Sequence, residues 1–240
     1  MKIYAIGDIH GCLRELTFLH EKIFTNDKFK IKDDLIIYLG DYIDRGLKSK
    51  QVIDQIIKLK SNNIKTIHLM GNHEEFLVDF LFKKINNIKK WLQFGADQTF
   101  KSYDIEIVDF IKDGFDDEII DRLRNTFLEK MSDEHINFFN NLEESFSTKK
   151  YLFAHAGVDP MKNLSEQTRK DYLWSRSPEF FDKSFKAKKI IIHGHTPVEN
   201  ITNHPYRINI DTGCFFSGKL TSVCLSDDVE SRLFISNLQK

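Results

Sequence analysis

The chain has 240 residues, with 35 Lys and Arg against 36 Asp and Glu and a formal net charge of −1. This length suits one large domain with a substantial core. Because the charge is balanced, no overall field favours nucleic acid or an anionic membrane, and we expect neither as a partner. No apolar run reaches the ~20 residues of a membrane span. The first polar motif begins at Gly7, inside any cleavable leader, so we expect no signal peptide.

The three cysteines, Cys12, Cys214 and Cys224, form no CxxC pair. This pattern argues against a disulfide framework and a structural zinc site, and it favours a reducing, cytoplasmic setting. Cys12 adjoins the first polar motif. We interpret it as a small packing residue at a helix start rather than as a redox or nucleophilic group.

Strands and helices alternate in the first part of the chain. Three apolar runs predict buried strands, and each is followed by a polar block containing glycine. They are Lys2–Ile6, Asp34–Leu39 and Ile64–Met70. Apolar residues at helical spacing over Leu13–Ile23 and Val52–Ile57 predict the helices between them, and Ser49 is placed to cap the second helix. The repetition predicts a layered α/β core with ligands at the carboxyl ends of the strands.

Residues 75–147 have a different character, with mixed charge, no proline and few strand signals. Helices are predicted over Glu75–Lys84, Ile119–Lys130 and Ser132–Leu142, the last with Ser132 as its N-cap. The acidic residues 116–118 are interpreted as a solvated helix start. We expect a single domain, residues 1–240, in which residues 75–147 form a helical cap over the site.

Strands return after this segment. Lys150–Ala154 and Lys189–Ile192 each run into a loop that carries histidine. A closing run of strands is predicted at Arg207–Ile210, Leu220–Leu225 and Leu233–Ser236. Asp211-Thr212-Gly213 and Asp227-Asp228 have the composition of turns.

Five short polar blocks at the ends of these predicted strands are rich in Asp, Asn and His. They are Gly7–Gly11 (GDIHG), Gly40–Gly46 (GDYIDRG), Gly71–Glu74 (GNHE), His155–Gly157 (HAG) and His193–Thr196 (HGHT). Glycine allows tight turns, and oxygen and imidazole donors suit divalent cations. The five blocks together predict a metal-centred site, although each one alone is weak evidence.

The blocks supply enough donors for two cations. The predicted ligands are Asp8, His10, Asp41, Asn72, His155 and His195. Asp8 and His10 are two residues apart, so in an extended segment they point the same way and can share one metal. A carboxylate such as Asp41 can bridge two cations ~3.5–4 Å apart. Such a positive site would attract phosphate and lower the pKa of a bridging water.

The neighbouring residues suggest acid catalysis. Asn72 and His73 are adjacent, so in an extended backbone their side chains diverge, and Asn72 can hold metal while His73 faces the leaving group. Asp44 is the predicted carboxylate partner that makes His73 a general acid. The guanidinium of Arg45 can fork two phosphate oxygens.

These residues resemble the signature of the phosphoprotein phosphatase family within the calcineurin-like metallophosphoesterase superfamily. The motifs GDxHG, GDxxDRG, GNHE, HA and GHT occur in order from residue 7 to about 213, most like small bacterial and bacteriophage serine/threonine phosphatases. The resemblance implies a four-layer α/β fold, with a central β-sandwich flanked by helices. It also implies two divalent metals, usually manganese in bacterial members, with iron, zinc or nickel as alternatives.

The resemblance also implies which residues bind each metal and which residue acts as the general acid. Asp8, His10 and Asp41 would bind the first metal. The second would be held by Asp41, Asn72, His155 and His195. His73 would be the general acid oriented by Asp44.

A second phosphate-binding arginine is expected between the HA and GHT motifs. Leu173–Arg176 resembles the corresponding bacteriophage segment, which makes Arg176 the prediction and a surface arginine the alternative. Asn72 is also assigned to substrate binding. We interpret His193 as structural, Glu74 as a hydrogen-bonding support and Asp211 as part of a loop.

The favoured function is hydrolysis of phosphomonoesters on proteins, with serine and threonine preferred and tyrosine as a further substrate, by in-line attack of a metal-bridging hydroxide. The first alternative is a small-molecule phosphoesterase of the diadenosine-tetraphosphatase kind. The Asp44-Arg45 pair and Glu74 favour the protein phosphatase at the level of family patterns. A catalytically inactive binding scaffold is disfavoured because every expected ligand is present.

Overall fold

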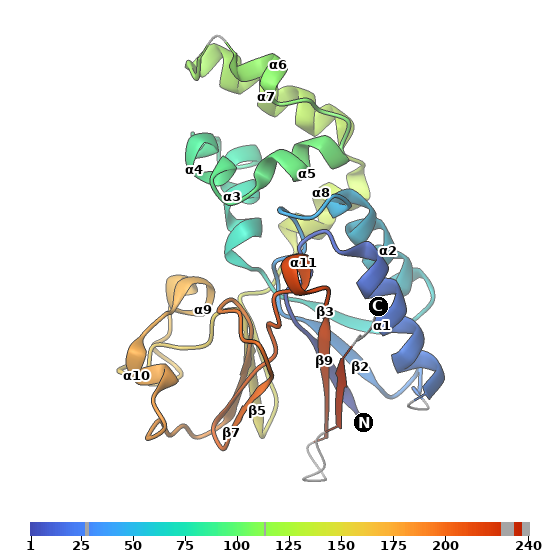
Figure 1. The fold of residues 1–240 in the computed structure, drawn as a ribbon, viewed down its shortest axis with the longest axis vertical. Coiled ribbons are helices and arrows are strands. Elements are labelled where there is room, and N and C mark those ends of the chain that lie inside the picture. Colours follow the sequence, from blue (N-terminus) through green and yellow to red (C-terminus); the bar gives the residue numbers. More distant parts are fainter. Residues whose placement is uncertain (27–28, 113, 227–232, 237–240) are drawn as a thin grey trace.

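Two five-stranded sheets form the centre of the molecule in the computed structural model (Figure 1). The structure describes residues 1–26, 29–112, 114–226 and 233–236. The first sheet has the order β10-β9-β1-β2-β3 and the second β4-β5-β6-β8-β7. The strands are β1 Ile3–Ile6, β2 Leu35–Tyr38, β3 Lys65–His68, β4 Ser145–Ser147, β5 Tyr151–Ala154, β6 Ile190–His193, β7 Thr202–His204, β8 Arg207–Asn209, β9 Thr221–Leu225 and β10 Leu233–Ser236.

Strand direction brings the polar blocks to one edge of the sandwich. β1, β2 and β3 are parallel in the first sheet, and β5, β6 and β8 are parallel in the second. β9 and β10 run antiparallel in the first sheet, as β4 and β7 do in the second. Ligands in such sheets gather at the carboxyl ends of the parallel strands, which is where the blocks lie.

Alternating apolar residues explain how the sheets pack. In β1, Ile3 and Ala5 belong to the core between the two sheets, whereas Tyr4 and Ile6 belong to the core beneath the helices. Side chains in a strand point alternately to opposite faces, so a strand buried on both faces reads as a continuous apolar run. All four residues are fully buried.

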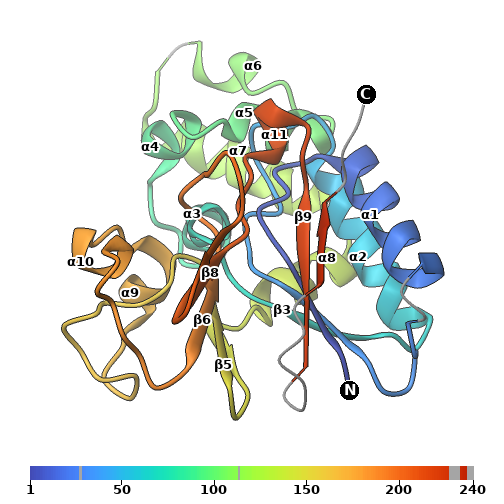
Figure 2. The ribbon, with the colours of Figure 1, turned by 60° about the horizontal axis from the view of Figure 1, so that its bottom comes forward.

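Helices cover the outer faces of both sheets (Figure 2). α1 (Leu13–Asn26) and α2 (Ser49–Ser61) lie over the first sheet, and α9 (Arg169–Trp174) and α10 (Pro178–Phe181) lie beside the second. The result is a helix–sheet–sheet–helix arrangement. The predicted four-layer α/β fold with a central β-sandwich is therefore confirmed.

Residues 75–147 are mainly helical, as predicted. Residues 75–130 lie beyond one end of the sheets (Figure 1), whereas residues 145–147 form strand β4 of the second sheet. The helices are α3 Asn72–Leu81, α4 Ile88–Leu92, α5 Ala96–Ser102, α6 Val108–Ile111, α7 Asp117–Lys130 and α8 Asp133–Asn140. Asp116 caps α7 by accepting from the Ile119 amide at 2.9 Å, and Ser132 caps α8 by accepting from the His135 amide at 3.3 Å. Both predicted helix starts are confirmed.

Some local predictions were wrong or incomplete. Lys48, rather than Ser49, is the N-cap of α2, because the Ser49 hydroxyl is directed to the Asp44 amide at 3.1 Å. The edge strands β4 and β7 were not predicted, because each has only three residues and is too short to show a clear alternation of apolar and polar residues. The turn predicted at Asp227-Asp228 lies outside the described residues. Within the described part of the chain, no helix is long and apolar enough to cross a bilayer.

Candidate metal centre and active site

The loops that follow the parallel strands carry an unusual backbone. Left-handed φ values occur at His10 (46°), Asp41 (53°), Asp44 (71°), Arg45 (65°) and His195 (66°). Such values are uncommon for residues other than glycine and cost conformational energy. Their concentration in the predicted site marks these turns as functional.

Asp41 joins two groups of donors. Its Oδ2 atom lies 3.4 Å from His10 Nε2 and 3.8 Å from His73 Nε2. Its Oδ1 atom lies 3.4 Å from His155 Nε2. The donor atoms of His10, Asp41 and His73 lie within 4.8 Å of one another, as do those of Asp41, His155 and His195. One carboxylate thus faces imidazole nitrogens on two sides.

Hydrogen bonds fix the orientation of two of these rings. His10 Nδ1 donates to the Ile43 carbonyl at 2.8 Å, and His155 Nδ1 donates to the Leu39 carbonyl at 3.0 Å. Burial lowers the pKa of both rings, so they are neutral and each Nε2 presents a lone pair toward Asp41. Lone pairs facing a carboxylate repel one another without a cation, so this buried donor set fits divalent metal.

Asn72 and His195 complete the second group. Asn72 Oδ1 lies 2.9 Å from His155 Nε2 and 2.8 Å from His195 Nδ1. Burial, followed by the nearby His155 ring, lowers the pKa of His195 to about 2. Asn72 is the first residue of α3, so the expectation of an extended backbone at Asn72-His73 was wrong. The two side chains diverge because successive helical residues are rotated by ~100°.

Asp8 and His10 do not lie in an extended segment, because the chain turns at His10. The Asp8 carboxylate accepts from the His195 amide at 3.0 and 3.3 Å. It also faces Asp211, a residue interpreted only as part of a loop. Burial, followed by the charges of Asp211 and Asp41, raises the pKa of Asp8 well above its usual range. That Asp8 shares a metal with His10 stays a prediction.

Asp211 does form the predicted loop, since its Oδ1 accepts from the Gly213 amide at 2.9 Å. The side chain is nevertheless buried beside Asp8. Burial raises the pKa of Asp211 to about 6. Asp211 therefore adds a buried, titratable carboxyl group to the site as well as shaping the turn.

His73 and Asp44 form a buried pair. His73 Nδ1 donates to Asp44 Oδ2 at 2.6 Å. Burial opposes protonation of His73, but the Asp41 charge and the Asp44 hydrogen bond outweigh it and raise the His73 pKa. Such a ring keeps its proton closer to neutral pH, as an acid catalyst requires.

Two residues that the sequence did not single out hold Asp44 in place. Trp91 Nε1 donates to Asp44 Oδ2 at 2.7 Å, and the Thr99 hydroxyl donates to Asp44 Oδ1 at 2.5 Å. Trp91 lies in α4 and Thr99 in α5. An indole and a hydroxyl in a helical segment give no sequence signal of this contact, because it spans 47 and 55 residues of chain.

Both predicted arginines reach the site. Arg45 donates from Nη2 to His73 Nε2 at 3.2 Å, and its guanidinium lies 4.7 Å from the centre of the Phe215 ring. Arg176 donates from Nε to His195 Nε2 at 3.0 Å, so it is not a distant surface residue. Phe215, which also packs edge-on against His10 at 5.6 Å, was missed because one Phe among 21 in the chain is not distinctive.

Glu74 and His193 take the supporting positions that were predicted. The fully buried Glu74 carboxylate accepts from the amides of Asp41 and Tyr42, both at 2.8 Å, and so fixes the turn that presents Asp41. His193 is also fully buried and packs against Phe180, with ring centres 5.0 Å apart. Among the described residues, the metal-compatible groups do not include His193.

Comparison with known proteins agrees with this geometry. A model of the calcineurin-like phosphoesterase family matches residues 1–219. The chain is 29% identical over 235 residues to a bis(5'-nucleosyl)-tetraphosphatase PrpE (asymmetrical) of Anoxybacillus flavithermus, covering 91% of this chain and 88% of that protein. A protein of the same name from Oceanobacillus iheyensis is 27% identical over 244 residues, covering 92% and 88%.

Solved structures share the fold. A crystal structure provisionally named a diadenosine tetraphosphatase has a TM-score of 0.64 at 17% identity, covering 100% of this chain and 95% of that one. A serine/threonine phosphatase from Saccharomyces cerevisiae has a TM-score of 0.60 at 17% identity, covering 98% and 79%. The chain is a metal-dependent phosphoester hydrolase, and it belongs to the calcineurin-like phosphoesterase family.

Proposed function

We propose that this protein is a two-metal hydrolase that cleaves dinucleoside tetraphosphates asymmetrically, into a nucleoside triphosphate and a nucleoside monophosphate. The observation that carries the two-metal assignment is Asp41, whose two oxygens each lie 3.4 Å from a different histidine, His10 and His155. The names of the relatives from Anoxybacillus and Oceanobacillus support the substrate. The protein phosphatase favoured by sequence patterns thereby becomes the second candidate.

The proposed ligand sets are those expected from the sequence. Asp8, His10 and Asp41 hold one cation, and Asp41, Asn72, His155 and His195 hold the other. Bound cations would supply Lewis-acid stabilisation of the phosphoryl oxygens and activate water for in-line attack on phosphorus. Manganese is the proposed metal, on the family resemblance alone.

The side chains around the proposed metals have separate roles in proton transfer and phosphate binding. His73 donates a proton to the departing oxygen, and Asp44 holds the ring with its proton-bearing Nε2 toward the substrate. Arg45 leaves its contact with His73 Nε2 to bind phosphate oxygens, as its planar fork allows. The rise in the pKa of His73 supports this role.

The contact between Arg176 and His195 suggests how phosphate binding is coupled to the metal site. Arg176 donates to His195 Nε2, so this nitrogen bears no proton and Nδ1 bears it. A His195 ring that ligates metal through Nδ1 must carry its proton on Nε2 instead. Arg176 then loses its acceptor, and its guanidinium becomes available to a substrate phosphate.

The second candidate is hydrolysis of phosphoserine, phosphothreonine or phosphotyrosine on proteins. It is supported by the intact Asp44–His73 pair, which acts on poor leaving groups such as a serine alkoxide. A nucleotide leaving group is a weaker base and needs less help from an acid. The two candidates therefore differ in how strongly the rate depends on His73.

The substrate assignment is tested by comparing kcat/KM values in manganese for diadenosine tetraphosphate and for phosphoserine, phosphothreonine and phosphotyrosine peptides. We expect the dinucleotide to be the best substrate and ATP and AMP to be the products. A higher kcat/KM for a phosphopeptide would favour the second candidate, and ADP as sole product would contradict asymmetric cleavage. The Asp41→Asn variant, purified in parallel, controls for contaminating phosphatases, because loss of the proposed bridging carboxylate should abolish activity on every substrate.

The metal assignment is tested separately by elemental analysis after dialysis. Asp41→Asn should bind fewer metal ions than the wild type, because one bridging carboxylate is lost. Asp54→Asn is the control, since Asp54 is half-exposed and pairs with His135 away from the site. An Asp41→Asn protein with two tightly bound metals would contradict the bridging role.

Two further expectations remain proposals. Residues 75–147 are proposed to act as a cap that influences substrate choice, supported by the position of residues 75–130 beyond the sheets (Figure 1). A cytoplasmic location is proposed from the cysteine pattern, supported by three cysteines that form no disulfide in the structure. A phosphoprotein or a small phosphoester remains the only partner proposed.

A further inference from the structure

Two of the three cysteines come together with a glutamate beside a surface cavity. The Sγ atoms of Cys12 and Cys214 and a carboxylate oxygen of Glu15 lie within 4.8 Å of one another. Cys214 is buried, whereas Cys12 and Glu15 are half-buried. This group is separate from the donors around Asp41, and neither the sequence motifs nor the proposed function makes use of it.

The group is built from two segments that are far apart in the chain. Cys12 precedes α1 and Glu15 lies in its first turn, so the two residues, three apart, share one face of the chain as it enters the helix. Cys214 begins α11 (Cys214–Ser217), which Gly213 and Gly218 bracket in left-handed conformations. Their φ values, 65° and 68°, fix the direction of this short turn.

The chemistry of the group suits a soft divalent cation. Thiolates with a carboxylate are recognised zinc ligands, with Zn–S distances of ~2.3 Å and Zn–O of ~2.1 Å in tetrahedral sites. Tetrahedral geometry at these lengths separates ligand atoms by about 3.5–4 Å. The observed upper limit of 4.8 Å is close enough for side-chain rotation to close the site.

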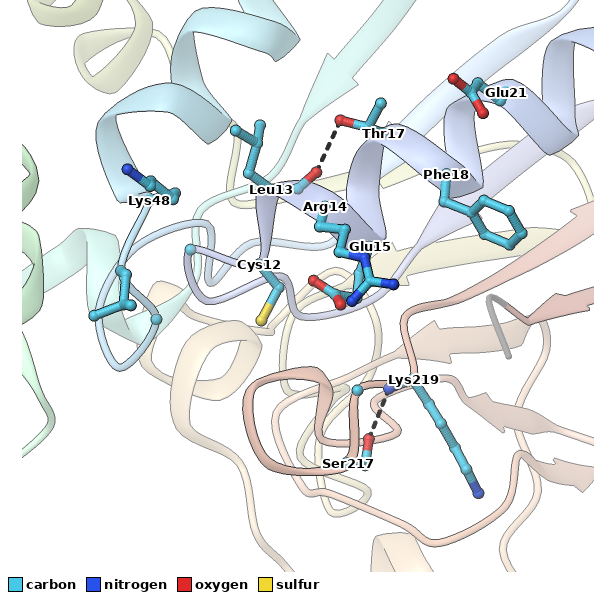
Figure 3. Close-up of a pocket in the computed structure, with 14 residues that line it drawn as sticks. Cys12, Leu13, Arg14, Glu15, Thr17, Phe18, Glu21, Lys48, Ser217 and Lys219 are labelled. Carbon is cyan, nitrogen blue, oxygen red and sulfur yellow. Dashed lines mark hydrogen bonds between the residues drawn. The ribbon is translucent and has the colours of Figure 1, made fainter. Parts of the chain in front are cut away.

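A cavity supplies access and room for a fourth ligand. Its volume is about 890 Å³, and Cys12, Glu15 and residues 217–219 are part of its lining. Figure 3 shows the Cys12 sulfur on the side of α1 that faces the segment carrying Ser217 and Lys219. Water from this cavity can fill an open position, as in zinc sites with three protein ligands.

Against the expectation from cysteine spacing alone, we propose that Cys12, Glu15 and Cys214 form an additional cation site for Zn²⁺ or another thiol-preferring divalent metal. A cation there would cross-link the start of α1 to α11. The loop before α1 carries Asp8 and His10, and the loop before α11 carries Asp211. The site would therefore stiffen two loops of the metal centre without itself taking part in the reaction.

The same two thiols could instead form a disulfide, a reaction that would need a peroxide or another oxidant. The metal is the better supported occupant because the third member is a carboxylate, which has no part in a disulfide. Hydrogen bonding with Cys12, together with burial, raises the pKa of Cys214. Metal uptake at the site would therefore release a proton.

Cadmium reports this site selectively, because Cd²⁺ bound to thiolate gives an ultraviolet charge-transfer band that histidine and carboxylate ligands do not. The full-length, reduced chain is first saturated with manganese and then titrated with Cd²⁺. We expect a saturable band at one equivalent. The band should disappear in Cys12→Ser and Cys214→Ser and bind several-fold more weakly in Glu15→Gln.

Cys224→Ser is the matched control, because Cys224 lies in β9 and is not a member of the group. It should keep the full band, and Zn²⁺ should raise its Tm as it does for the wild type but not for Cys12→Ser. If Cys214→Ser fails to fold, Cys12→Ser and Glu15→Gln still test the proposal, because both of these residues are only half-buried. A band of unchanged size in Cys12→Ser, or no band in the wild type, would overturn the proposal. So would a Cys12–Cys214 disulfide that forms in air while reduced protein binds no cadmium.

Discussion

The His73 ring donates a 2.6 Å hydrogen bond to the Asp44 carboxylate, and both side chains are almost completely inaccessible to solvent. Asp44 in turn accepts from Trp91 and Thr99, which belong to the helical segment beyond the sheets. That segment therefore holds Asp44 in place beside His73. Deleting the whole segment would disturb the His73–Asp44 pair as well as any cap, so substitutions are the better test of each proposed role.

Replacing His73 should slow the reaction most where the leaving group is a strong base. We expect His73→Asn to lower kcat by about 10²–10⁴-fold on alkyl phosphates such as phosphoserine peptides. The loss should be much smaller on p-nitrophenyl phosphate, whose phenolate leaves without protonation. Steady-state rates on both substrates provide the measurement, with the partly exposed His204→Asn as control. Equal losses on both substrates would show that His73 is not the acid.

Loss of the contacts to Asp44 should weaken catalysis while the fold is retained. Trp91→Phe removes the indole donor but keeps most of the ring, and we expect kcat to fall by about tenfold with KM little changed, because the His73–Asp44 pair loses its alignment. Thr99→Val should have a similar effect, and Thr99→Ser should restore activity by keeping the hydroxyl. Tyr103→Phe is the matched control, because its buried hydroxyl bonds to His135 instead. If Thr99→Ser and Thr99→Val were equally impaired, the hydroxyl contact would not be the cause.

The pH dependence of activity should follow the His73 pKa. Asp44 helps to raise this pKa above its usual value, and the acid must be protonated to act. In Asp44→Asn the raised pKa of His73 falls, so the alkaline limb of the kcat profile should move to lower pH. Profiles on an alkyl phosphate, for which protonation matters, make the shift measurable. A limb that stays in place would assign it to a group other than His73.

Arg176 should matter for substrate rather than for folding. Arg176→Ala should lower kcat/KM by about 10–10³-fold, in keeping with loss of charged hydrogen bonds to phosphate. Arg176→Lys should recover only part of this, because lysine cannot fork two oxygens. Arg122→Ala, on the exposed face of α7, is the control. Full activity in Arg176→Ala would remove this residue from the phosphate site.

Stability toward acid should improve when His193 is replaced. Burial lowers the pKa of His193 to about 3, against 6.5 for the ordinary imidazole. Between these values the unfolded chain binds a proton that the folded chain does not, so stability is lost as the pH falls below about 6.5. Between pH 7 and pH 4.5 the free energy of unfolding of the wild type should fall by about 2–3 kcal/mol more than that of His193→Leu. Urea unfolding of both proteins at the two pH values provides the measurement. An identical pH dependence in both proteins would contradict the buried neutral state of His193.

The sequence by itself determined which residue types gather in the candidate site and where most of the strands lie along the chain. Apolar runs ending in Gly, Asp and His predict strand–loop units, because burial on both faces and tight turns impose local residue choices. For this reason the blocks from Asp8 to His195 could be found without a structure. Capping chemistry placed the helix start at Ser132, and acidic residues indicated the one at residues 116–118.

Only the tertiary structure decided which side chains meet. The contacts of Asp44 with Trp91 and Thr99, of Asp8 with Asp211, and of Arg176 with His195 each join residues from distant segments. The grouping of Cys12 with Cys214 is of the same kind. Such contacts depend on how the sheets and loops pack. The residues next to a side chain in the sequence therefore do not reveal a partner that only folding brings close.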